Sequence, residues 1–242
     1  MKKIVKKWVP MKWKNALRRS FYWYGMFPKR KKTIINQFHA LYYDDGLRFG
    51  RNTWRNTFWF GVPLKKCPTD LWIYQELLYK IRPDVIVECG TAYGGSAYYL
   101  ACLLDLLGKG RVISIDIREC DKRPQHDRIT YLLGSSTSEA ILTEVKEAVK
   151  GVPTVMVILD SDHSKAHVLE ELRKYHLLVT MGSYLIVEDT NVYGHPVALE
   201  FGPGPMEALD IFLKENKNFV RDEGAEKFYM TFNPKGYLKR VL

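Results

Sequence analysis

Carboxylates are concentrated at the ends of two apolar segments of this chain. The segment 155–160 ends in Asp160, followed by Asp162 and His163, and the segment 184–188 ends in Glu188, followed by Asp189. Strands that end at one edge of a sheet bring such side chains together. Hard oxygen ligands of this kind suit Mg²⁺, which completes its shell with water and substrate oxygens. A metal held there would lower the pKa of a substrate hydroxyl and orient it.

Each of these residues also has a structural explanation. Asp160 or Asp189 can cap the segment that follows it, which requires no metal. His163 is a candidate general base because imidazole titrates near neutral pH, yet a histidine at a helix start is about as often a hydrogen-bonded surface residue. The sequence therefore predicts an acidic site at a sheet edge, with His163 and Asp160 as candidate catalytic residues.

A turn that contains two glycines follows another short apolar segment and indicates a nucleotide-like ligand. The segment 85–88 ends in Glu88, and Gly90 and Gly94 precede the next helical pattern. The G-x-x-x-G spacing lacks the full G-x-G-x-x-G pattern of dinucleotide sites, which favours S-adenosyl-L-methionine over a dinucleotide. Asp116, 26 residues after Gly90, is placed to accept hydrogen bonds from ribose hydroxyls. The alternative is tight strand-to-helix packing beside an ordinary surface aspartate.

Short apolar segments alternate with amphipathic ones through most of the chain. Strands are predicted at 85–88, 112–117, 129–133, 155–160 and 184–188, and helices at 71–81, 96–107, 138–149, 165–178 and 206–216. Strands joined by crossover helices form a parallel sheet that is covered on both sides. The end of the chain differs, because 227–232 and 237–241 predict an antiparallel hairpin. The predicted fold class is α/β: a Rossmann-like, mostly parallel seven-stranded sheet with a C-terminal antiparallel hairpin.

Length and composition are typical of one catalytic domain with an N-terminal addition. The 242 residues can bury one full-sized core, and the four cysteines show no paired spacing, which suits a reducing cytoplasm. No long apolar stretch or signal-peptide pattern is present, so we expect a cytoplasmic protein. We divide the chain into a basic aromatic segment at 1–35, an irregular lid or cap at 36–68 and the catalytic domain at 69–242.

The positive charge of the chain lies in its N-terminal segment. Residues 1–43 contain twelve lysines and arginines and no acidic residue, whereas the remaining 25 basic residues nearly balance 27 acidic ones. Aromatic residues are interspersed there, and short helical pieces are predicted, one of them around 13–24. Such a segment can pack on its own domain or lie against the inner face of an anionic membrane. Nucleic acid is a weaker expectation, and a homo-oligomer is left open.

Six stretches carry a resemblance to a known family. They are FHALYYDDG at 38–46, GVPLKKCPTDLWIYQEL at 61–77, VECGTAYGGSA at 87–97, LDSDHS at 159–164, YLIVEDT at 184–190 and FGPGPMEALDIFL at 201–213. Over roughly residues 38–242, the chain resembles the cephalosporin hydroxylase and rhamnosyl O-methyltransferase family. The resemblance implies a class I methyltransferase that binds S-adenosyl-L-methionine and a Mg²⁺ ion. The Mg²⁺ ligands would be Asp160, Glu188 and Asp189.

The resemblance also implies where the cofactor and the acceptor bind. The loop after the third strand lies near the adenine in related Rossmann methyltransferases. The expected cofactor-binding residues are Glu88, Gly90, Thr91, Gly94, Ser96, Asp116, Ser135 and Ser136. The acceptor would be a rhamnosyl or other sugar or glycolipid hydroxyl, or an antibiotic nucleus. Aromatic residues that could line its pocket, although core packing explains each equally well, are Tyr42, Tyr43, Trp54, Trp59 and Trp72.

Two other functions compete with methyl transfer. The hydroxylase name within the family would require oxygen chemistry, but no pair of histidines stands with a carboxylate at the strand ends, as a 2-His-1-carboxylate site would need. A binding module could also retain the fold without catalysis and bind membranes or nucleic acid through its basic segment. We expect a Mg²⁺-assisted O-methyltransferase with His163 or solvent as the proton acceptor.

Overall fold

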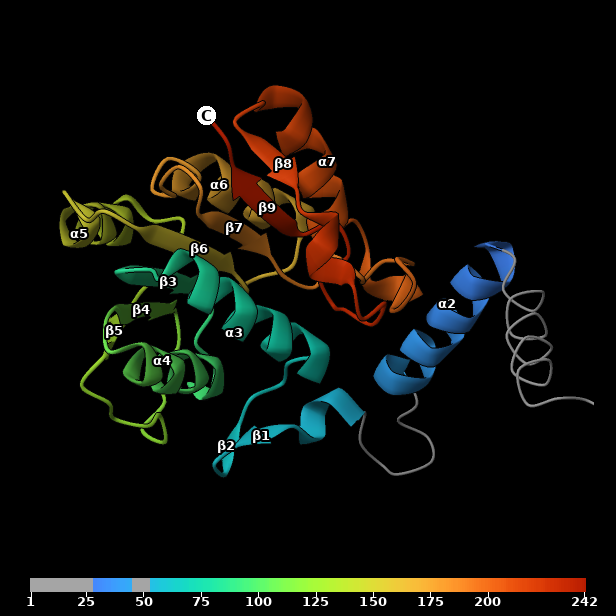
Figure 1. The fold of residues 1–242 in the computed structure, drawn as a ribbon, viewed down its shortest axis with the longest axis horizontal. Coiled ribbons are helices and arrows are strands. Elements are labelled where there is room, and N and C mark those ends of the chain that lie inside the picture. The colour runs from blue at the N-terminus through green and yellow to red at the C-terminus, as the bar shows by residue number, and fades with distance from the viewer. Residues whose placement is uncertain (1–27, 45–52) are drawn as a thin grey trace, which may run out of the picture.

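The computed structural model describes residues 28–44 and 53–242, and its centre is a seven-stranded sheet (Figure 1). The strands are β3 (Val85–Cys89), β4 (Arg111–Asp116), β5 (Ile129–Leu133), β6 (Val155–Leu159), β7 (Tyr184–Val187), β8 (Phe219–Arg221) and β9 (Tyr237–Arg240). Their order is β5-β4-β3-β6-β7-β9-β8. The first five strands in this order, β5, β4, β3, β6 and β7, are parallel to one another, and β9 is antiparallel to both of its neighbours, β7 and β8. The predicted fold class is confirmed.

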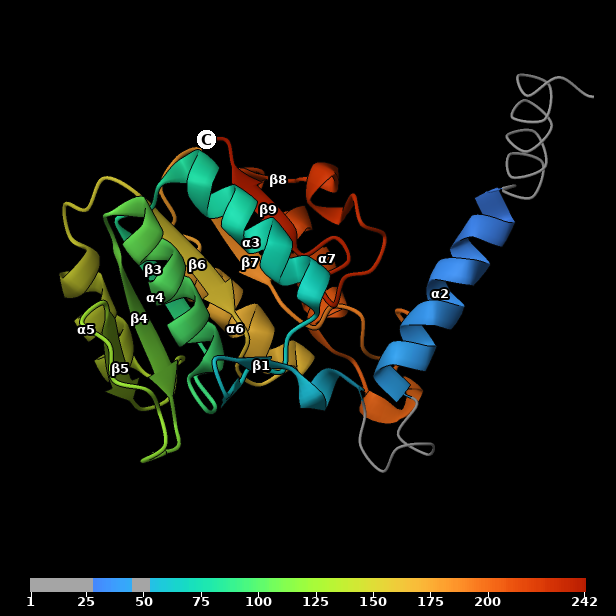
Figure 2. The ribbon, with the colours of Figure 1, turned by 60° about the horizontal axis from the view of Figure 1, so that its bottom comes forward.

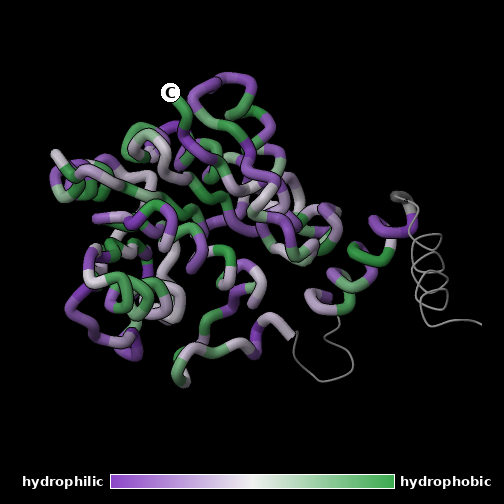
Figure 3. Tube along the Cα trace, viewed as in Figure 1, coloured by the Kyte–Doolittle hydropathy of each residue, from purple (hydrophilic) through white to green (hydrophobic). Residues whose placement is uncertain are grey.

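Helices cover both faces of this sheet (Figures 1 and 2). Helices α3 (Pro68–Ile81) and α4 (Gly95–Leu107) pack on one face, and α5 (Glu139–Val149), α6 (Lys165–Tyr175) and α7 (Pro205–Glu215) pack on the other. Successive side chains of β3 alternate between the two cores, because Ile86 belongs to the core under α3 and α4 and Val87 to the core under α6 and α7. The hydropathy trace shows the central strands as apolar segments between polar loops (Figure 3).

Local signals in the sequence account for the helix ends. Ser138 caps α5 by accepting a hydrogen bond from the Ile141 amide. Pro68 and Pro205 occupy the first turn of α3 and α7, where a missing N–H costs nothing. Because these signals lie in the chain itself, all five helices that the sequence predicts after residue 68 are present within three residues of their expected ends.

The C-terminal antiparallel pair exists, but its predicted first strand is wrong. Strand β8 pairs with β9, whereas 227–232 is not a strand. The backbone of 230–232 bonds to the start of α3 instead, because Thr69 Oγ1 donates to the Met230 carbonyl at 2.5 Å and Asp70 accepts from the Phe232 amide at 2.8 Å. The β-branched and aromatic residues of this segment predict a strand, but its backbone bonds to side chains of α3 and not to a neighbouring strand.

The segment before α3 is more ordered than the irregular lid that the sequence predicts. It contains α2 (Pro28–Asp44), a 3-10 turn η2 (Thr53–Asn56) and the two short strands β1 (Phe58–Trp59) and β2 (Val62–Pro63). The expected boundary between residues 35 and 36 falls inside α2. The helical piece predicted around 13–24 lies outside the described residues. Within the described ranges, none of the helices combines the length and apolarity that crossing a membrane requires.

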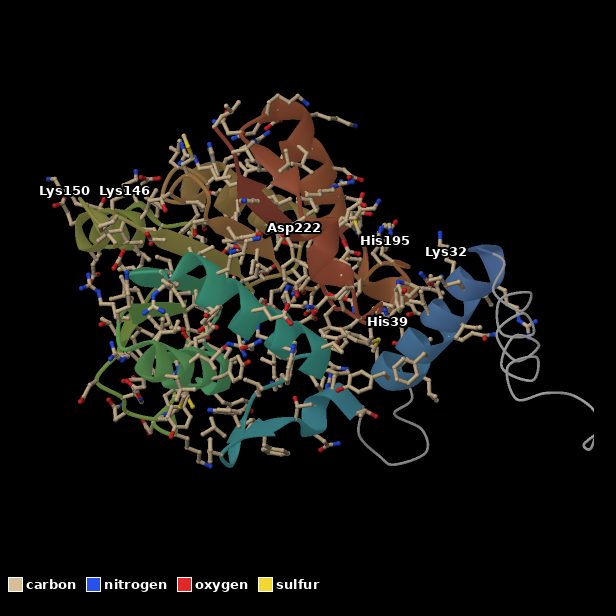
Figure 4. All side chains as sticks on the ribbon, viewed as in Figure 1. Lys32, His39, Lys146, Lys150, His195 and Asp222 are labelled. Carbon is tan, nitrogen blue, oxygen red and sulfur yellow. The ribbon has the colours of Figure 1, made fainter. Side chains whose placement is uncertain are left out.

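Helix α2 is attached to the domain by aromatic packing near its C-terminal end. His39 is 3% exposed and stacks on Phe232, and its Nε2 accepts a hydrogen bond from the Asn191 side chain at 3.0 Å. Tyr43 packs edge-on against Phe232 and stacks on Trp54. In Figure 4, His39 lies where α2 meets the domain, and Lys32 lies towards the other end of the helix. Burial lowers the pKa of His39 to about 4.

We predict that α2 detaches as the pH falls. A released His39 titrates near 6.5 and the docked one near 4, so docking is strongest above pH 6.5 and weakens between 6.5 and 4. The cost is about 2 kcal/mol at pH 5. Hydrogen exchange of the α2 amides, corrected for intrinsic rates, should report this loss at pH 5 relative to pH 7. His39→Phe keeps the ring and removes the titration, so an equal loss in that variant would contradict the prediction.

Candidate active site

The site lies where the chain changes direction across the sheet. From β3 the chain moves outward through β4 and β5 and then returns to β6 on the other side of β3. The carboxyl ends of β3 and β6 therefore diverge into loops at a topological switch point, the usual ligand-binding position in an open α/β sheet. The glycine turn follows β3 and the first acidic cluster follows β6, so both predicted sites meet at this edge.

Gly90 brings the two loops into direct backbone contact. Its φ is +102°, and a Cβ at this position would lie 1.9 Å from the Asp160 carbonyl oxygen. The Asp160 amide in turn donates to the Cys89 carbonyl at 2.7 Å. Only glycine fits this approach. Gly94, with φ of +78°, caps the start of α4, where a Cβ would come within 2.9 Å of the Tyr131 hydroxyl.

Glu88 is a buried carboxylate with one free oxygen. The Ser114 hydroxyl donates to its Oε2 at 2.6 Å, whereas its Oε1 has no hydrogen-bond partner among the described residues. Burial raises the pKa of Glu88 to about 7, against the opposing effects of the Lys66 charge and of the Ser114 and Ser96 hydroxyls. A buried acceptor without a partner is costly. The free oxygen therefore indicates that Glu88 receives a donor from a ligand.

Asp116 holds the glycine turn from the neighbouring strand. Its Oδ2 accepts from the amides of Thr91 and Ala92 at 3.2 and 2.7 Å, and its Oδ1 accepts from Arg118. Arg123 lies 3.4 Å from the same carboxylate. The Thr91 hydroxyl bonds to Ser114 at 2.7 Å. The predicted residues Thr91 and Asp116 thus meet at the turn, although the Asp116 carboxylate already faces several protein donors.

The loop after β5 is tied to α6 by a buried glutamate that the sequence analysis missed. Glu171, at 0% exposure, accepts from the Ser136 hydroxyl at 2.5 Å and from the Ser161 hydroxyl at 2.7 Å. Ser135 bonds locally to Thr137 at 3.0 Å. Glu171 therefore connects the predicted adenine loop to the loop after β6. In the sequence, Glu171 is one of several charged residues of an amphipathic helix, so nothing in its spacing distinguishes it from an exposed glutamate.

Asp160, His163 and Asp189 converge at the mouth of the site. His163 Nε2 lies 3.2 Å from Asp189 Oδ2 and 3.9 Å from Asp160 Oδ1. One ligand atom from each of the three residues lies within 4.8 Å of the others, a grouping suited to a metal ion. Their side chains are about one fifth exposed, so solvent and a substrate can reach them. Asp189 has a left-handed φ of +53°, a strain that is common at functional sites.

Glu188 points away from this group and bonds to Lys66, a second residue that the sequence analysis missed. The Lys66 ammonium lies 2.5 Å from Glu188 Oε1 and 2.5 Å from Asp160 Oδ2. The Tyr74 hydroxyl also donates to Glu188. Asp160 therefore has an inner oxygen on Lys66 and an outer oxygen towards His163. Lys66 stands beside Lys65 in a basic stretch, and nothing in its spacing distinguishes a buried lysine from an exposed one.

Burial and mutual repulsion act on the ionisable groups of this cluster. Burial raises the pKa of Asp160, Glu188 and Asp189 above their usual range, while Lys66 opposes the rise at Asp160 and Glu188 and His163 opposes it at Asp189. Although burial by itself lowers the pKa of an ammonium, the charges of Asp160, Glu188 and Glu88 raise that of Lys66 above its ordinary value. The charges of the cluster thus stabilise one another, as in other buried ion pairs.

Aromatic side chains border the site unevenly. Phe201 is 47% exposed and its ring centroid lies 6.5 Å from that of His163. Burial raises the pKa of Tyr43, and the nearby charge of Asp189 adds to the rise. Of the other predicted pocket residues, Trp59 packs on Tyr99 and Trp72 is exposed. Tyr42 and Trp54 pack against the cluster of Cys67, Met230 and Phe232.

Removal of the Lys66 ammonium should destabilise the protein strongly. Lys66→Met leaves two carboxylates unpaired in a buried site, and loss of one partner from a buried ion pair costs about 3–5 kcal/mol. The matched control is Lys65→Met, because Lys65 is exposed and its ammonium only lies over the Tyr93 ring at 4.7 Å. That change should cost no more than about 1 kcal/mol. Equal losses in urea unfolding for the two variants would contradict the role of Lys66.

Comparisons with known proteins agree with this architecture. The family described as Rhamnosyl O-methyltransferase/CmcI matches residues 51–241. The rhamnosyl O-methyltransferase of Mycobacterium leprae (strain TN) is 35% identical over 222 residues, covering 89% of this chain and 94% of the relative. That of Mycobacterium tuberculosis (strain ATCC 25618 / H37Rv) is also 35% identical, covering 89% and 88%.

Solved structures share the fold at lower identity. An apo structure of CmcI superposes with a TM-score of 0.61 at 23% identity and covers 80% of each chain. A CmcI structure with Mg and SAM gives a TM-score of 0.59 at 22% identity with the same coverage. The family match and the curated relatives each span most of the chain. It therefore belongs to the rhamnosyl O-methyltransferase/CmcI family of S-adenosylmethionine-dependent O-methyltransferases.

Proposed function

We propose that the protein transfers a methyl group from S-adenosylmethionine to a sugar or glycolipid hydroxyl, assisted by Mg²⁺. The observation that carries this proposal is the direct contact between the glycine turn after β3 and the acidic loop after β6, at Gly90 and Asp160. A cofactor on the turn and an acceptor on the acidic group would be immediate neighbours. Methyl transfer depends on such positioning of the reacting groups.

The residues around the turn fit the cofactor. The free Oε1 of Glu88 is a buried acceptor that suits a ligand amino or hydroxyl group. Gly90 leaves the space that a side chain would fill, and Thr91 and Asp116 hold the turn in place. The proposed cofactor-binding residues are Glu88, Gly90, Thr91, Gly94, Ser96, Asp116, Ser135 and Ser136. Of these, Ser136 acts by holding its loop through Glu171.

The acidic cluster fits a divalent cation. Asp160 and Asp189 converge with His163, and all three offer atoms within a small volume. Glu188 lies outside this group, with its Oε1 on the Lys66 ammonium at 2.5 Å, and would become the third carboxylate ligand where the metal replaced that ammonium. We assign Asp160, Glu188 and Asp189 to Mg²⁺, whose preferred ligands are such oxygens. When bound, Mg²⁺ supplies charge that lowers the pKa of a hydroxyl, and S-adenosylmethionine supplies the methyl group.

The residues of the chain perform the proton transfer and the orientation. His163 Nε2 accepts the proton of the acceptor hydroxyl, and the nearby carboxylates of Asp189 and Asp160 stabilise the imidazolium that forms. Phe201 offers an exposed ring beside His163, on which the apolar face of a sugar packs. Helix α2 is tied to the loop after β7 by the hydrogen bond between His39 and Asn191, and its Tyr43 ring stacks on Trp54 of η2.

The acceptor class rests on the relatives. The two mycobacterial proteins are rhamnosyl O-methyltransferases, and their likeness extends over 89% of this chain. A MycE methyltransferase structure, which was solved with Mg, SAH and mycinamycin VI, shares the fold with a TM-score of 0.52 at 16% identity over 70% of this chain. Rhamnosyl groups are therefore the first acceptors to examine.

Oxygen chemistry is disfavoured by the ligand set. Across residues 28–44 and 53–242, the group of side chains that could hold a metal contains one histidine and two aspartates. The facial triad of non-haem iron oxygenases needs two histidines and one carboxylate. A binding module without catalysis would also have no need of three carboxylates gathered at one sheet edge, which repel one another.

Substitution of the acidic residues should weaken Mg²⁺ binding. In calorimetry with S-adenosylmethionine present, Asp160→Asn and Asp189→Asn should each reduce Mg²⁺ affinity at least tenfold, roughly the loss of one charged ligand. Glu188→Gln should do the same. Asp210→Asn, an exposed aspartate on α7, is the control and should have no effect. If Mg²⁺ affinity survives Glu188→Gln alone, the ligands are Asp160 and Asp189, and Glu188 serves Lys66.

Methyl transfer should be seen with rhamnosyl acceptors and should depend on His163. We expect labelled methyl groups to reach a rhamnoside in the presence of Mg²⁺ and the rate to fall when the metal is chelated. His163→Gln should lower kcat by about 10²–10⁴ with little change in the binding of S-adenosylmethionine. The matched control is His126→Gln, a histidine whose Nε2 lies 3.0 Å from Asp105 and that takes no part in the acidic group. Full activity without Mg²⁺ would refute the role of the carboxylates, and no binding of the cofactor would refute the function itself.

A further inference from the structure

One face of α2 is apolar although it faces solvent. Ile34, Phe38 and Leu41 are 51%, 53% and 56% exposed. Their spacing of four and three residues places them in one row along the helix. His39 and Tyr43, which dock the helix on Phe232, lie on the other side. The helix thus buries one aromatic face in the domain and presents a second apolar row outward.

Basic residues accompany this outer row. Arg30 is one turn before Ile34 on the same side of the helix and is exposed, whereas the exposed Lys32, two residues before Ile34, lies on a different side. Neither forms an ion pair among the described residues. They belong to the stretch 1–43, which holds twelve basic residues and no acid. Apolar residues flanked by cations are the pattern of a helix that lies in the plane of an anionic membrane.

We infer that the outer face of α2, formed by Arg30, Ile34, Phe38 and Leu41, docks on an anionic lipid surface. A second copy of this chain is a poorer partner, since each copy carries the positive charge of residues 1–43 and the two copies would repel each other. Nucleic acid contacts are mainly polar and leave an aliphatic row unused. A lipid surface satisfies both properties, because its headgroups pair with the cations and its acyl boundary accepts the apolar row.

Helix α2 also lies near the proposed acceptor site. Nine residues separate Ile34 from Tyr43, a distance of about 14 Å along a helix. Tyr43 lies one turn after His39, which bonds at 3.0 Å to Asn191, two residues after Asp189. A lipid surface on the outer face of α2 therefore lies near the acceptor site. The lipid contact itself does not depend on catalysis.

Vesicle sedimentation of the full chain tests the contact. Phosphatidylglycerol vesicles should bind the protein at least about tenfold more tightly than phosphatidylcholine vesicles, and added salt should weaken the binding. The triple change Ile34→Gln, Phe38→Gln and Leu41→Gln should abolish this binding, and Arg30→Glu should weaken it. The matched control is Leu106→Gln, Leu177→Gln and Met181→Gln, three residues that are 85%, 64% and 73% exposed elsewhere and should have no effect.

Three results would overturn the inference. They are equal binding to the two vesicles, a triple variant that binds like the wild type, and a triple variant that alters only the oligomeric mass in light scattering. Circular dichroism melts verify that each variant is folded. The triple variant should keep full activity on a water-soluble rhamnoside, so loss of vesicle binding is separable from loss of methyl transfer. If the rhamnoside is not methylated while vesicles still bind, only the proposed function fails.

Discussion

The ammonium of Lys66 holds the centre of this molecule together. It joins Asp160, at the end of β6, to Glu188, at the end of β7, each at 2.5 Å. Without this cation, carboxylates from two neighbouring parallel strands would repel one another in a poorly solvated place. Because Lys66 lies two residues before α3, the same ion pairs also anchor that helix beside the site. Tyr74, on α3, adds a hydrogen bond to Glu188.

Further contacts extend from this centre to the N-terminal helix. Asp70, in the first turn of α3, accepts from the Phe232 amide at 2.8 Å and thereby positions the Phe232 ring. That ring receives His39 and Tyr43 of α2. A chain of polar and aromatic contacts thus runs from the carboxylates of the sheet edge to α2. The position of α2 near the acceptor site depends on this chain of contacts, and α2 itself carries few apolar residues into the core.

The cofactor and metal sites are coupled by backbone contact. Gly90 and Asp160 are in van der Waals contact through main-chain atoms, and Ser161, the next residue, reaches the same Glu171 that holds Ser136. A displacement of the loop after β3 would therefore displace the loop after β6, since packed backbones transmit small movements. This arrangement suits a reaction in which an acceptor oxygen and a methyl donor must be aligned closely.

Sequence by itself determined the parallel sheet, its crossover helices and the strand ends at Glu88, Asp160 and Asp189, because periodicity, prolines and caps act locally. Tertiary structure decided the rest. Lys66 pairs with Asp160 and Glu188, more than 90 residues away, and Glu171 accepts from Ser136, 35 residues away. Residues 227–232 bond to α3 although their pattern predicts a strand. The Glu188 side chain is also oriented by its ion pair with Lys66. Burial and pairing of charges arise from contacts between distant segments of the chain, so a local sequence pattern does not predict them.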